Sequence, residues 1–502
     1  MFYRMLNAYL IFICSFFFDS LQAQQSIKQP MNVIFILADD HRYDAMGFMN
    51  KIQGLETPGM DRMAREGCHI KNAFVSTALC SPSRASILTG QYAHTHTVVD
   101  NDAPLPAGLT FFPQYLQKKG YKTGFFGKWH MGNTDDKPQP GFDQWVSFQG
   151  QGVYYDPVFN INGKRVKQAD GSYTTDLLTE NALSWLSSLK KEQPFFVYLS
   201  HKGVHAEFNP AKRHRGKYAN LPVICPPSMY LTATDSSKTY GKMTAPETEV
   251  NYSDIPQWVR NQRYSWHGVD YMYHGTILFD DFYRRYFETL QAVDESVESV
   301  LNYVKEKGLE QHTMVIYMGD NGFSFGEHGL IDKRHAYEES MRVPLLAWAP
   351  GLIKAGSILP QTIMNVDIAP TVMELAGLSK PANMQGQSFL PLLQEKNIPW
   401  RHSVFYEYYW EAAFPQTPTI FAIRNDRFKY IYNHGVWDIN ELYDLKTDPF
   451  EMNNLIRNKD YQKEGRALRD TLFNWLENSK GLQIPLNKAR GTKFDNLYKE
   501  TY

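Results

Sequence analysis

The chain has 502 residues, which is enough to bury a large core and to form more than one domain. Its 52 lysines and arginines nearly balance 53 aspartates and glutamates, so the formal net charge is −1. This balance excludes the strongly basic class of nucleic-acid-binding proteins, and we expect no nucleic-acid partner.

The N-terminus has the composition of a signal peptide. Arg4 gives a short positive region, and the apolar run 6–18 that follows is too short to span a bilayer comfortably. Residues 21–23 form a candidate cleavage site, so we predict a signal peptide over residues 1–23. The mature protein would then be periplasmic or secreted, with no membrane contact after cleavage. An uncleaved membrane anchor is the alternative.

A pair of carboxylates follows the first predicted strand. Residues 32–37 are apolar and rich in β-branched side chains, which predicts a buried parallel strand. Asp39 and Asp40 come after it, at the edge where open α/β sheets place their ligands. Adjacent carboxylates crowd negative charge, and a hard cation relieves that crowding. A metal site is one interpretation of this pair, and a solvated turn is the other. Residues 57–67 then predict a helix.

The stretch Cys80-Ser81-Pro82-Ser83-Arg84 places a reactive group where an anion is favoured. Proline is tolerated in the first turn of a helix, so a helix here would begin close to Cys80 and end near Gly90. Arg84 lies about one helical turn beyond Cys80 and would point back toward it. The free N–H groups and the positive dipole at such a helix start attract anions. A buried structural cysteine beside a surface arginine is the alternative.

This stretch, with Ala-Ser-Ile-Leu-Thr-Gly after it, resembles the active-site motif of the type I sulfatases. In that family a maturation enzyme oxidises the motif cysteine to formylglycine (3-oxoalanine), which is the nucleophile. The resemblance implies that Cys80 is this modified residue, and that a formylglycine-generating enzyme is a partner. It also implies that Asp39 and Asp40 are the first metal-ligand motif.

Two short polar motifs follow. His94 and His96 would point the same way on an extended segment, and a similar His-x-His-x-Val stretch occurs in glucosamine-6-sulfatase-like enzymes. They are candidate substrate contacts, with an ordinary surface loop as the alternative. A helix is expected over residues 112–119. Lys128 and His130 then form a compact cationic pair between glycines. The pair resembles the sulfatase Gly-Lys-x-His motif, in which the lysine contacts sulfate and the histidine supports formylglycine.

A predicted helix over residues 176–191 and a buried strand over 194–200 lead to His205. In the family, the histidine after this strand protonates the leaving group, and the resemblance assigns that role to His205. His201 is the weaker candidate, and Val204 stands where many relatives have proline. Residues 211–279 show little pattern, and we expect them to form either lids over the site or a variable surface insertion.

The second half of the chain repeats the arrangement of polar residues after a strand. A helix over 282–307 and a strand over 313–318 precede Asp320 and Asn321, two oxygen donors that resemble the second metal motif of the family. Lys333 matches the second sulfate-contacting lysine, and His328 is a further candidate substrate contact. A strand over 343–349 and a helix over 366–375 follow.

The alternation of strands and helices up to about residue 390 predicts an α/β sandwich with a mostly parallel central sheet. The resemblance implies an alkaline-phosphatase-like fold. Short aromatic strands at 403–409, 419–424, 428–432 and 441–444, with a helix over 461–479, predict a smaller antiparallel sheet. We therefore expect a catalytic domain over residues 24–390 and a C-terminal α+β subdomain over residues 391–502.

The resemblance also implies the chemistry. One hydroxyl of hydrated formylglycine would attack sulfur, and the other would then expel sulfate from the covalent ester. Arg84, Lys128 and Lys333 would spread the charge that develops on the sulfate, and His130 would tune the hydrate. One divalent cation, expected to be Ca²⁺, would lie among oxygen donors and no sulfur. Its expected ligands are Asp39, Asp40, the modified Cys80, Asp320 and Asn321.

The expected function is hydrolysis of sulfate esters on carbohydrate. Export and a 14% content of aromatic residues favour a sulfated polysaccharide or oligosaccharide, with algal ulvan and 6-sulfated glucosamine of glycosaminoglycans as candidates. The alternatives are a phosphonate or phosphodiester hydrolase of the same superfamily and a non-catalytic carbohydrate-binding protein. If Cys80 is modified, Cys68 and Cys225 could pair, a question that the sequence leaves open.

Overall fold

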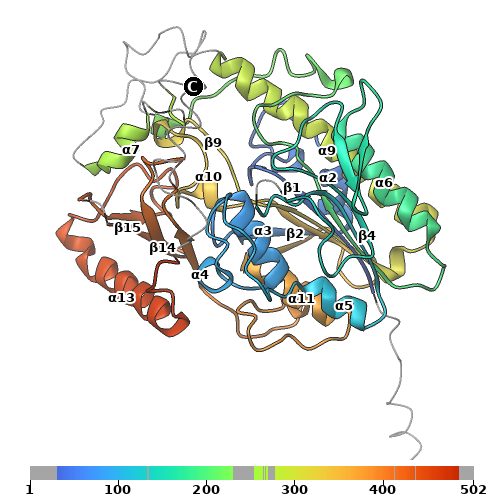
Figure 1. The fold of residues 1–502 in the computed structure, drawn as a ribbon. Coiled ribbons are helices and arrows are strands. Elements are labelled where there is room, and N and C mark those ends of the chain that lie inside the picture. Colours follow the sequence, from blue (N-terminus) through green and yellow to red (C-terminus); the bar gives the residue numbers. More distant parts are fainter. Residues whose placement is uncertain are drawn as a thin grey trace, which may run out of the picture.

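A ten-stranded sheet forms the centre of the computed structural model (Figure 1). The structure describes residues 31–132, 135–229, 254–263, 265, 267–269, 277–411, 413–435 and 437–485. The predicted signal peptide and a large part of the 211–279 segment lie outside these residues. The strand order is β12 (Ser357–Met364), β2 (Cys68–Phe74), β11 (Leu345–Trp348), β8 (Thr313–Gly319), β1 (Asn32–Ala38), β7 (Phe195–Ser200), β3 (Lys122–Lys128), β4 (Gln144–Phe148), β5 (Val158–Ile161) and β6 (Lys164–Lys167).

The middle of this sheet is parallel, which confirms the predicted fold class. Strands β8, β1, β7, β3 and β4 run in one direction, and β12 is parallel to β2. The exceptions are β11, which is antiparallel to both of its neighbours, and the outer hairpin of β5 and β6. Parallel strands need crossover connections, and helices between the strands supply them.

Helices cover both faces of the sheet, and the side chains of β1 show why. Val33, Phe35 and Leu37 belong to one apolar cluster, whereas Ile34 and Ile36 belong to a second cluster on the other face. A strand buried on both sides needs apolar residues at every position, as residues 32–37 have. One face carries α3 (Cys80–Thr89), α5 (Phe112–Lys118) and α11 (Ile368–Leu375), and the other carries α2 (Pro58–Glu66), α6 (Thr174–Ser188) and α9 (Phe279–Glu306).

The C-terminal region forms a four-stranded antiparallel sheet, as predicted. Its strands are β13 (Ser403–Tyr408), β14 (Thr419–Asn425), β15 (Phe428–His434) and β16 (Glu441–Asp444), paired in chain order. Helix α13 (Gln462–Ser479) packs Leu468, Leu472 and Leu476 against this sheet. In Figure 1 the small sheet and α13 lie beside the end of the molecule at which α3 begins.

Shorter elements complete the set of α-helices and strands in the described chain, apart from single turns of 3₁₀ helix. They are α4 (Ala93–His96), α7 (Gln257–Gln262), β9 (Ser324–Phe325), β10 (Ile331–Asp332), α10 (Glu338–Met341) and α12 (Leu390–Leu393). Helix α4 corrects one expectation, because His94 and His96 lie on a helical turn and not on an extended segment. Within the described ranges, no helix has the length and apolar character needed to cross a membrane.

Candidate active site

The carboxyl ends of four neighbouring strands bring the predicted residues together. Ala38 of β1 is in register with Gly319 of β8, and Ser200 of β7 pairs with Leu37 of β1 and with Gly127 of β3. The loops that follow these strands therefore start from one edge of the sheet. They carry Asp39 and Asp40, Asp320 and Asn321, His205, and the Lys128–His130 segment.

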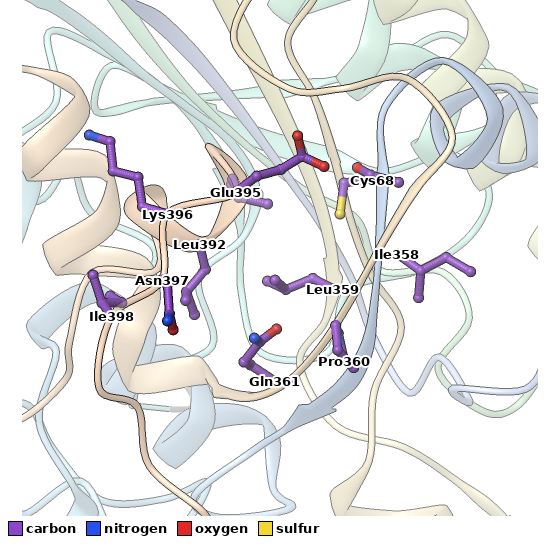
Figure 2. Close-up of a pocket in the computed structure, with 12 residues that line it drawn as sticks. Cys68, Ile358, Leu359, Pro360, Gln361, Leu392, Glu395, Lys396, Asn397 and Ile398 are labelled. Carbon is purple, nitrogen blue, oxygen red and sulfur yellow. The ribbon is translucent and has the colours of Figure 1, made fainter.

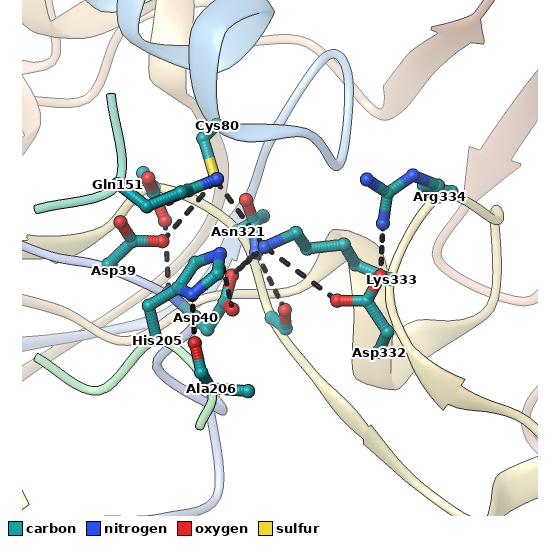
Figure 3. Close-up of polar contacts among 12 residues, drawn as sticks. Asp39, Asp40, Cys80, Gln151, His205, Ala206, Asn321, Asp332, Lys333 and Arg334 are labelled. Carbon is teal, nitrogen blue, oxygen red and sulfur yellow. Dashed lines mark hydrogen bonds and ion pairs between the residues drawn. The ribbon is translucent and has the colours of Figure 1, made fainter. Parts of the chain in front are cut away.

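Cys80 is the first residue of α3, and its side chain is fully buried. Leu79 before it is extended, and Gly90 closes the helix in the left-handed conformation at φ 67°. The Sγ atom lies 3.3 Å from Asp39 Oδ1, 3.4 Å from Lys333 Nζ and 3.6 Å from Lys128 Nζ (Figure 3). Burial, followed by the charge of Asp39, raises the pKa of the Cys80 thiol to about 12. The unmodified thiol is therefore protonated at neutral pH and is a poor nucleophile.

Arg84 lies one helical turn after Cys80 and ties α3 to the strand ends. Its Nη2 donates to Asp320 Oδ2 at 2.8 Å and to Asp39 Oδ2 at 3.3 Å. Its Nη1 donates to the carbonyl oxygen of Lys128 at 2.7 Å. Although burial opposes the charged form, these two carboxylates raise the pKa of Arg84 above its ordinary value. The sequence predicted that Arg84 faces the Cys80 pocket, and the structure places it there.

Three buried carboxylates and an amide make a set of oxygen donors beside Cys80. Oxygens of Asp39, Asp40 and Asp320 all lie within 4.8 Å of one another. Asn321 donates through Nδ2 to Asp40 Oδ1 at 2.7 Å, and its own Oδ1 is buried without a hydrogen-bond partner among the described residues. Burial raises the pKa of Asp40 to about 7, as do the charges of the neighbouring carboxylates. Crowded carboxylates and an unused amide oxygen fit a hard divalent cation such as Ca²⁺.

Two lysines reach Cys80 from different sides. Lys128 Nζ makes close ion-pair contact with Asp39, and Lys333 Nζ makes the same contact with Asp40. Both side chains are almost completely buried. Figure 3 shows the Lys333 amine between Cys80 and Asp40. The two ammonium groups are thus placed to hold an anion next to position 80.

His205 stands at the edge of the cluster and is partly exposed. Its Nε2 lies 3.9 Å from Asp40 Oδ2, while its Nδ1 is bonded to the carbonyl oxygen of Ala206. Because a carbonyl can only accept, Nδ1 carries the proton of the neutral ring and Nε2 is the free position. Burial, followed by the charges of Lys128 and Lys333, holds the pKa of His205 well below its usual range. An anion between these lysines and His205 would raise that pKa.

His130 is buried close to the charged groups of the cluster. Neither ring nitrogen has a hydrogen-bond partner in the described part of the chain, although its carbonyl oxygen accepts a bond from the Ser81 hydroxyl. Burial and the charge of Lys128 hold the pKa of His130 well below its usual range. Its ring nitrogens are therefore available for a hydrogen bond to a polar group on residue 80.

The three histidines predicted to touch substrate have protein partners instead. His94 bonds through Nδ1 to Glu407 Oε2 at 2.7 Å, and His96 bonds through Nε2 to Ser86 Oγ at 3.0 Å. His328 stacks on the ring of Tyr337 with the centroids 3.8 Å apart. All three are buried. These contacts explain the three side chains as packing and hydrogen-bonding residues, and a role in substrate binding stays a prediction.

Sequence reasoning missed two polar partners of the cluster. The Lys128 ammonium donates to Gln151 Oε1, and the Ser200 hydroxyl donates to the carbonyl oxygen of Lys128 at 2.8 Å. Gln151 lies between two glycines after β4, a pattern that marks a polar side chain on a tight loop. Ser200 is the last residue of the predicted strand, where parallel sheets present their functional groups.

The C-terminal sheet holds the loop that delivers Lys333. Arg334 donates through Nε to Glu411 Oε1 at 3.0 Å, the residue that also accepts from Tyr408. Tyr337 donates to Glu441 at 2.6 Å. Figure 3 shows Arg334 bonded to Asp332, whose other carboxylate oxygen lies 3.7 Å from Lys333 Nζ. Contacts of the C-terminal subdomain with Arg334 and Tyr337 therefore fix the loop that carries Lys333.

The remaining cysteines lie in other places. Cys68 lines a cavity of about 290 Å³ between β12 and the segment around Glu395 and Lys396 (Figure 2). Cys225 packs against the cluster on the face of α9. Cys68 is a free thiol in the structure, so its pairing with Cys225, which the sequence left open, is not formed.

Comparison with known proteins agrees with this geometry. The family model described as Sulfatase matches residues 31–378, and the model described as N-sulphoglucosamine sulphohydrolase, C-terminal, matches residues 326–478. The chain is 34% identical to an N-acetylglucosamine-6-O-sulfatase of Bacteroides thetaiotaomicron, over 89% of this chain and 86% of that protein. It is 26% identical to an ulvan-active sulfatase of Formosa agariphila, over 95% of this chain and 87% of that protein.

A solved structure gives the same result for the fold. It shows a protein in complex with its substrate, D-glucosamine-2-N,6-O-disulfate, and superposes with a TM-score of 0.80 at 30% identity. The match covers 91% of this chain and all of that one. The alkaline-phosphatase-like fold expected from the sequence is therefore confirmed.

Proposed function

Since the chain belongs to the sulfatase family, we propose that it hydrolyses sulfate esters of carbohydrates with formylglycine at position 80 as the nucleophile. The observation that carries the proposal is the environment of Cys80 Sγ, which lies within 3.6 Å of the ammonium groups of both Lys128 and Lys333. A hydrated aldehyde at this position supplies a hydroxyl that attacks sulfur and a second hydroxyl that allows sulfate to leave.

The chain's own cations bind and orient the sulfate. Lys128 and Lys333 donate to its oxygens from different sides, and Arg84 holds the carboxylates of Asp39 and Asp320 in place behind position 80. Because the lysines are buried, their charges are weakly screened, and they act most strongly on the charge that develops on the sulfate oxygens. The first turn of α3 adds few donors, because Ser81 N donates to Asn101 Oδ1, Ser83 N donates to the carbonyl oxygen of Leu79, and Pro82 has no N–H.

His205 protonates the leaving sugar oxygen. Its Nδ1–H is fixed by the carbonyl oxygen of Ala206, so Nε2 is the nitrogen that takes up and donates the proton. The bound sulfate opposes the two lysine charges and so shifts the pKa of His205 upward, toward the protonated form that proton donation requires. A ring nitrogen of His130, which has no other partner among the described residues, forms a hydrogen bond with a hydroxyl at position 80.

Asp39, Asp40, Asp320 and Asn321 would hold a divalent cation, and their oxygen-only chemistry favours Ca²⁺. When bound, the cation lowers the pKa of a hydroxyl that coordinates it and neutralises sulfate charge.

The favoured substrate is a 6-sulfated glucosamine, since relatives that act on this sugar match nearly the whole chain. Ulvan is the second candidate, on the evidence of the Formosa agariphila relative. We further propose that the protein is exported after cleavage of residues 1–23, that a formylglycine-generating enzyme matures Cys80, and that the C-terminal subdomain begins near residue 391.

Sulfate release by purified protein tests the proposal. The wild-type protein, produced with the maturation enzyme, should release sulfate from N-acetylglucosamine-6-O-sulfate, and Cys80→Ala should release none. The same preparation is assayed on ulvan oligosaccharides and on an aryl phosphodiester. Sulfate release by Cys80→Ala would refute the nucleophile, and a higher kcat/KM on the phosphodiester would refute the sulfatase assignment in favour of the related hydrolase.

A further inference from the structure

Lys202 is a buried cation that has no acidic partner among the described residues. It follows β7 and is only 5% exposed. Every other buried lysine or arginine that the structure describes lies within ion-pair distance of a carboxylate, whereas Lys202 does not. The paired side chains are Arg42, Arg84, Lys128, Lys333, Arg334, Arg424 and Lys429.

An unpaired buried charge is costly, so its presence needs a reason. The Lys202 ammonium lies 4.7 Å from the ring centroid of Tyr154, a contact that compensates for only part of the lost hydration. Burial, followed by repulsion from Lys128, lowers the pKa of Lys202 to about 8. Asp39 and Asp40 favour the charged form only from beyond ion-pair distance, so an anionic ligand in direct contact would compensate the charge further.

The position of Lys202 places such a ligand next to the sulfatase site. The carbonyl oxygen of Lys202 accepts a hydrogen bond from His205 N at 3.0 Å, and that of Gly203 accepts one from Asp39 N at 2.9 Å. Tyr154, under the ammonium, donates through its hydroxyl to the carbonyl oxygen of His205 at 2.6 Å. The same backbone thus carries Lys202 and the group assigned to protonate the leaving sugar.

Charge balance indicates which part of the substrate Lys202 meets. Around Cys80, the cations Arg84, Lys128 and Lys333 match the carboxylates Asp39, Asp40 and Asp320 one for one. The sulfate that is cleaved has its place between the two lysines that contact Cys80 Sγ, and Lys202 makes no such contact within the described residues. Its surplus charge is therefore available for a different anion.

We propose that Lys202 binds a second sulfate group on the same sugar whose sulfate ester faces position 80. The inference rests on the proposed function and extends it from a reaction to a substrate class. A sugar with one sulfate at the cleaved position and a second one on its ring, such as an N-sulfate, would place the second group against Lys202. Lys202 is then a specificity-determining residue that acts on one class of substrate.

Kinetics on two sugars that differ in this one group test the inference. D-glucosamine-2-N,6-O-disulfate carries the second sulfate, and N-acetylglucosamine-6-O-sulfate has a neutral amide in its place. Lys202→Met should lower the ratio of kcat/KM for the disulfate to kcat/KM for the N-acetyl sugar by about tenfold or more, since a charge-assisted hydrogen bond is lost. Lys202→Arg should keep most of the ratio, and Lys212→Met, at an exposed lysine of the same stretch, should leave it unchanged.

Other outcomes would overturn the inference. An unchanged ratio in Lys202→Met, or an equal loss on both sugars, would show that Lys202 does not discriminate the second sulfate. The thermal midpoint of Lys202→Met should equal or exceed that of wild type, because an unpaired buried charge has been removed. A clearly lower midpoint would mean that the ammonium serves the fold. Failure of the wild-type protein on both sugars would instead refute the proposed function, and the inference with it.

Discussion

Removal of the Lys429 ammonium should destabilise the protein strongly. Lys429 belongs to β15 and is fully buried, 3.0 Å from Glu338 Oε1 and 2.7 Å from Glu451 Oε1. Glu338 begins α10, five residues after Lys333, so this ion-pair group joins the C-terminal sheet to the loop that forms the site. Lys429→Met keeps a side chain of similar length but removes the positive charge that balances the buried carboxylates of Glu338 and Glu451. Loss of one partner from a buried ion pair costs about 3–5 kcal/mol.

The size of the effect should depend on pH. Burial raises the pKa of Glu451 to about 7 from an ordinary value near 4.5. Between these two pKa values the folded protein keeps a proton on Glu451 that the unfolded chain has released. The stability that this proton contributes is therefore fully present below about pH 4.5 and is lost as the pH rises through about 7. Without Lys429 this pKa rises further, and the stability lost in Lys429→Met should be larger at pH 8 than at pH 5.5.

Urea unfolding followed by tryptophan fluorescence measures the change, with Lys446→Met at an exposed position after β16 as the control. The control should change the free energy of unfolding by less than about 0.5 kcal/mol. Addition of Glu451→Gln to Lys429→Met should recover part of the loss, because one uncompensated carboxylate is removed. A loss below about 1 kcal/mol in Lys429→Met would show that the pair is not a structural link and would refute this reasoning.

Two further predictions concern the site. EDTA should lower both sulfate release and the thermal midpoint of unfolding, and Ca²⁺ should restore both. Asn321→Ala should weaken the Ca²⁺-dependent rise in the midpoint. A midpoint that changes with neither EDTA nor Ca²⁺ would refute the proposed metal site. His205→Gln should lower kcat by about 10²–10⁴-fold on a sugar sulfate but much less on an aryl sulfate, whose leaving phenol needs no proton, and an equal loss on both would contradict proton donation by His205.

The pattern of apolar, proline and glycine residues in the sequence was sufficient to predict the strands, the helix ends and the polar residues that directly follow the strands. The apolar run at residues 32–37 predicted a strand buried on both faces, and the positions of Asp39 and Asp320 after their strands followed from the rule that ligands gather at carboxyl ends of parallel strands. The helix Cys80–Thr89 followed from the proline in its first turn and from Gly90, which caps its end.

Contacts between distant segments were beyond the reach of the same reasoning. His94 and His96 have the spacing of an extended segment, yet Glu407 of β13 and Ser86 of α3 bind them on a buried helical turn, so tertiary partners determined their conformation. That Lys202 lacks a carboxylate partner among the described residues can be seen only from the folded structure. Lys333 matched a motif, but its support by Arg334 and Glu411 depends on a subdomain that follows much later in the chain.

The mass of the peptide that contains residue 80 tests the central claim most directly. Trypsin should release residues 72–84 from protein produced with the maturation enzyme. We predict a peptide that is lighter than the encoded one by one sulfur and two hydrogens and heavier by one oxygen, as formylglycine requires, with the change located at residue 80 by fragmentation. A peptide with an intact cysteine from protein that nevertheless releases sulfate would contradict the account.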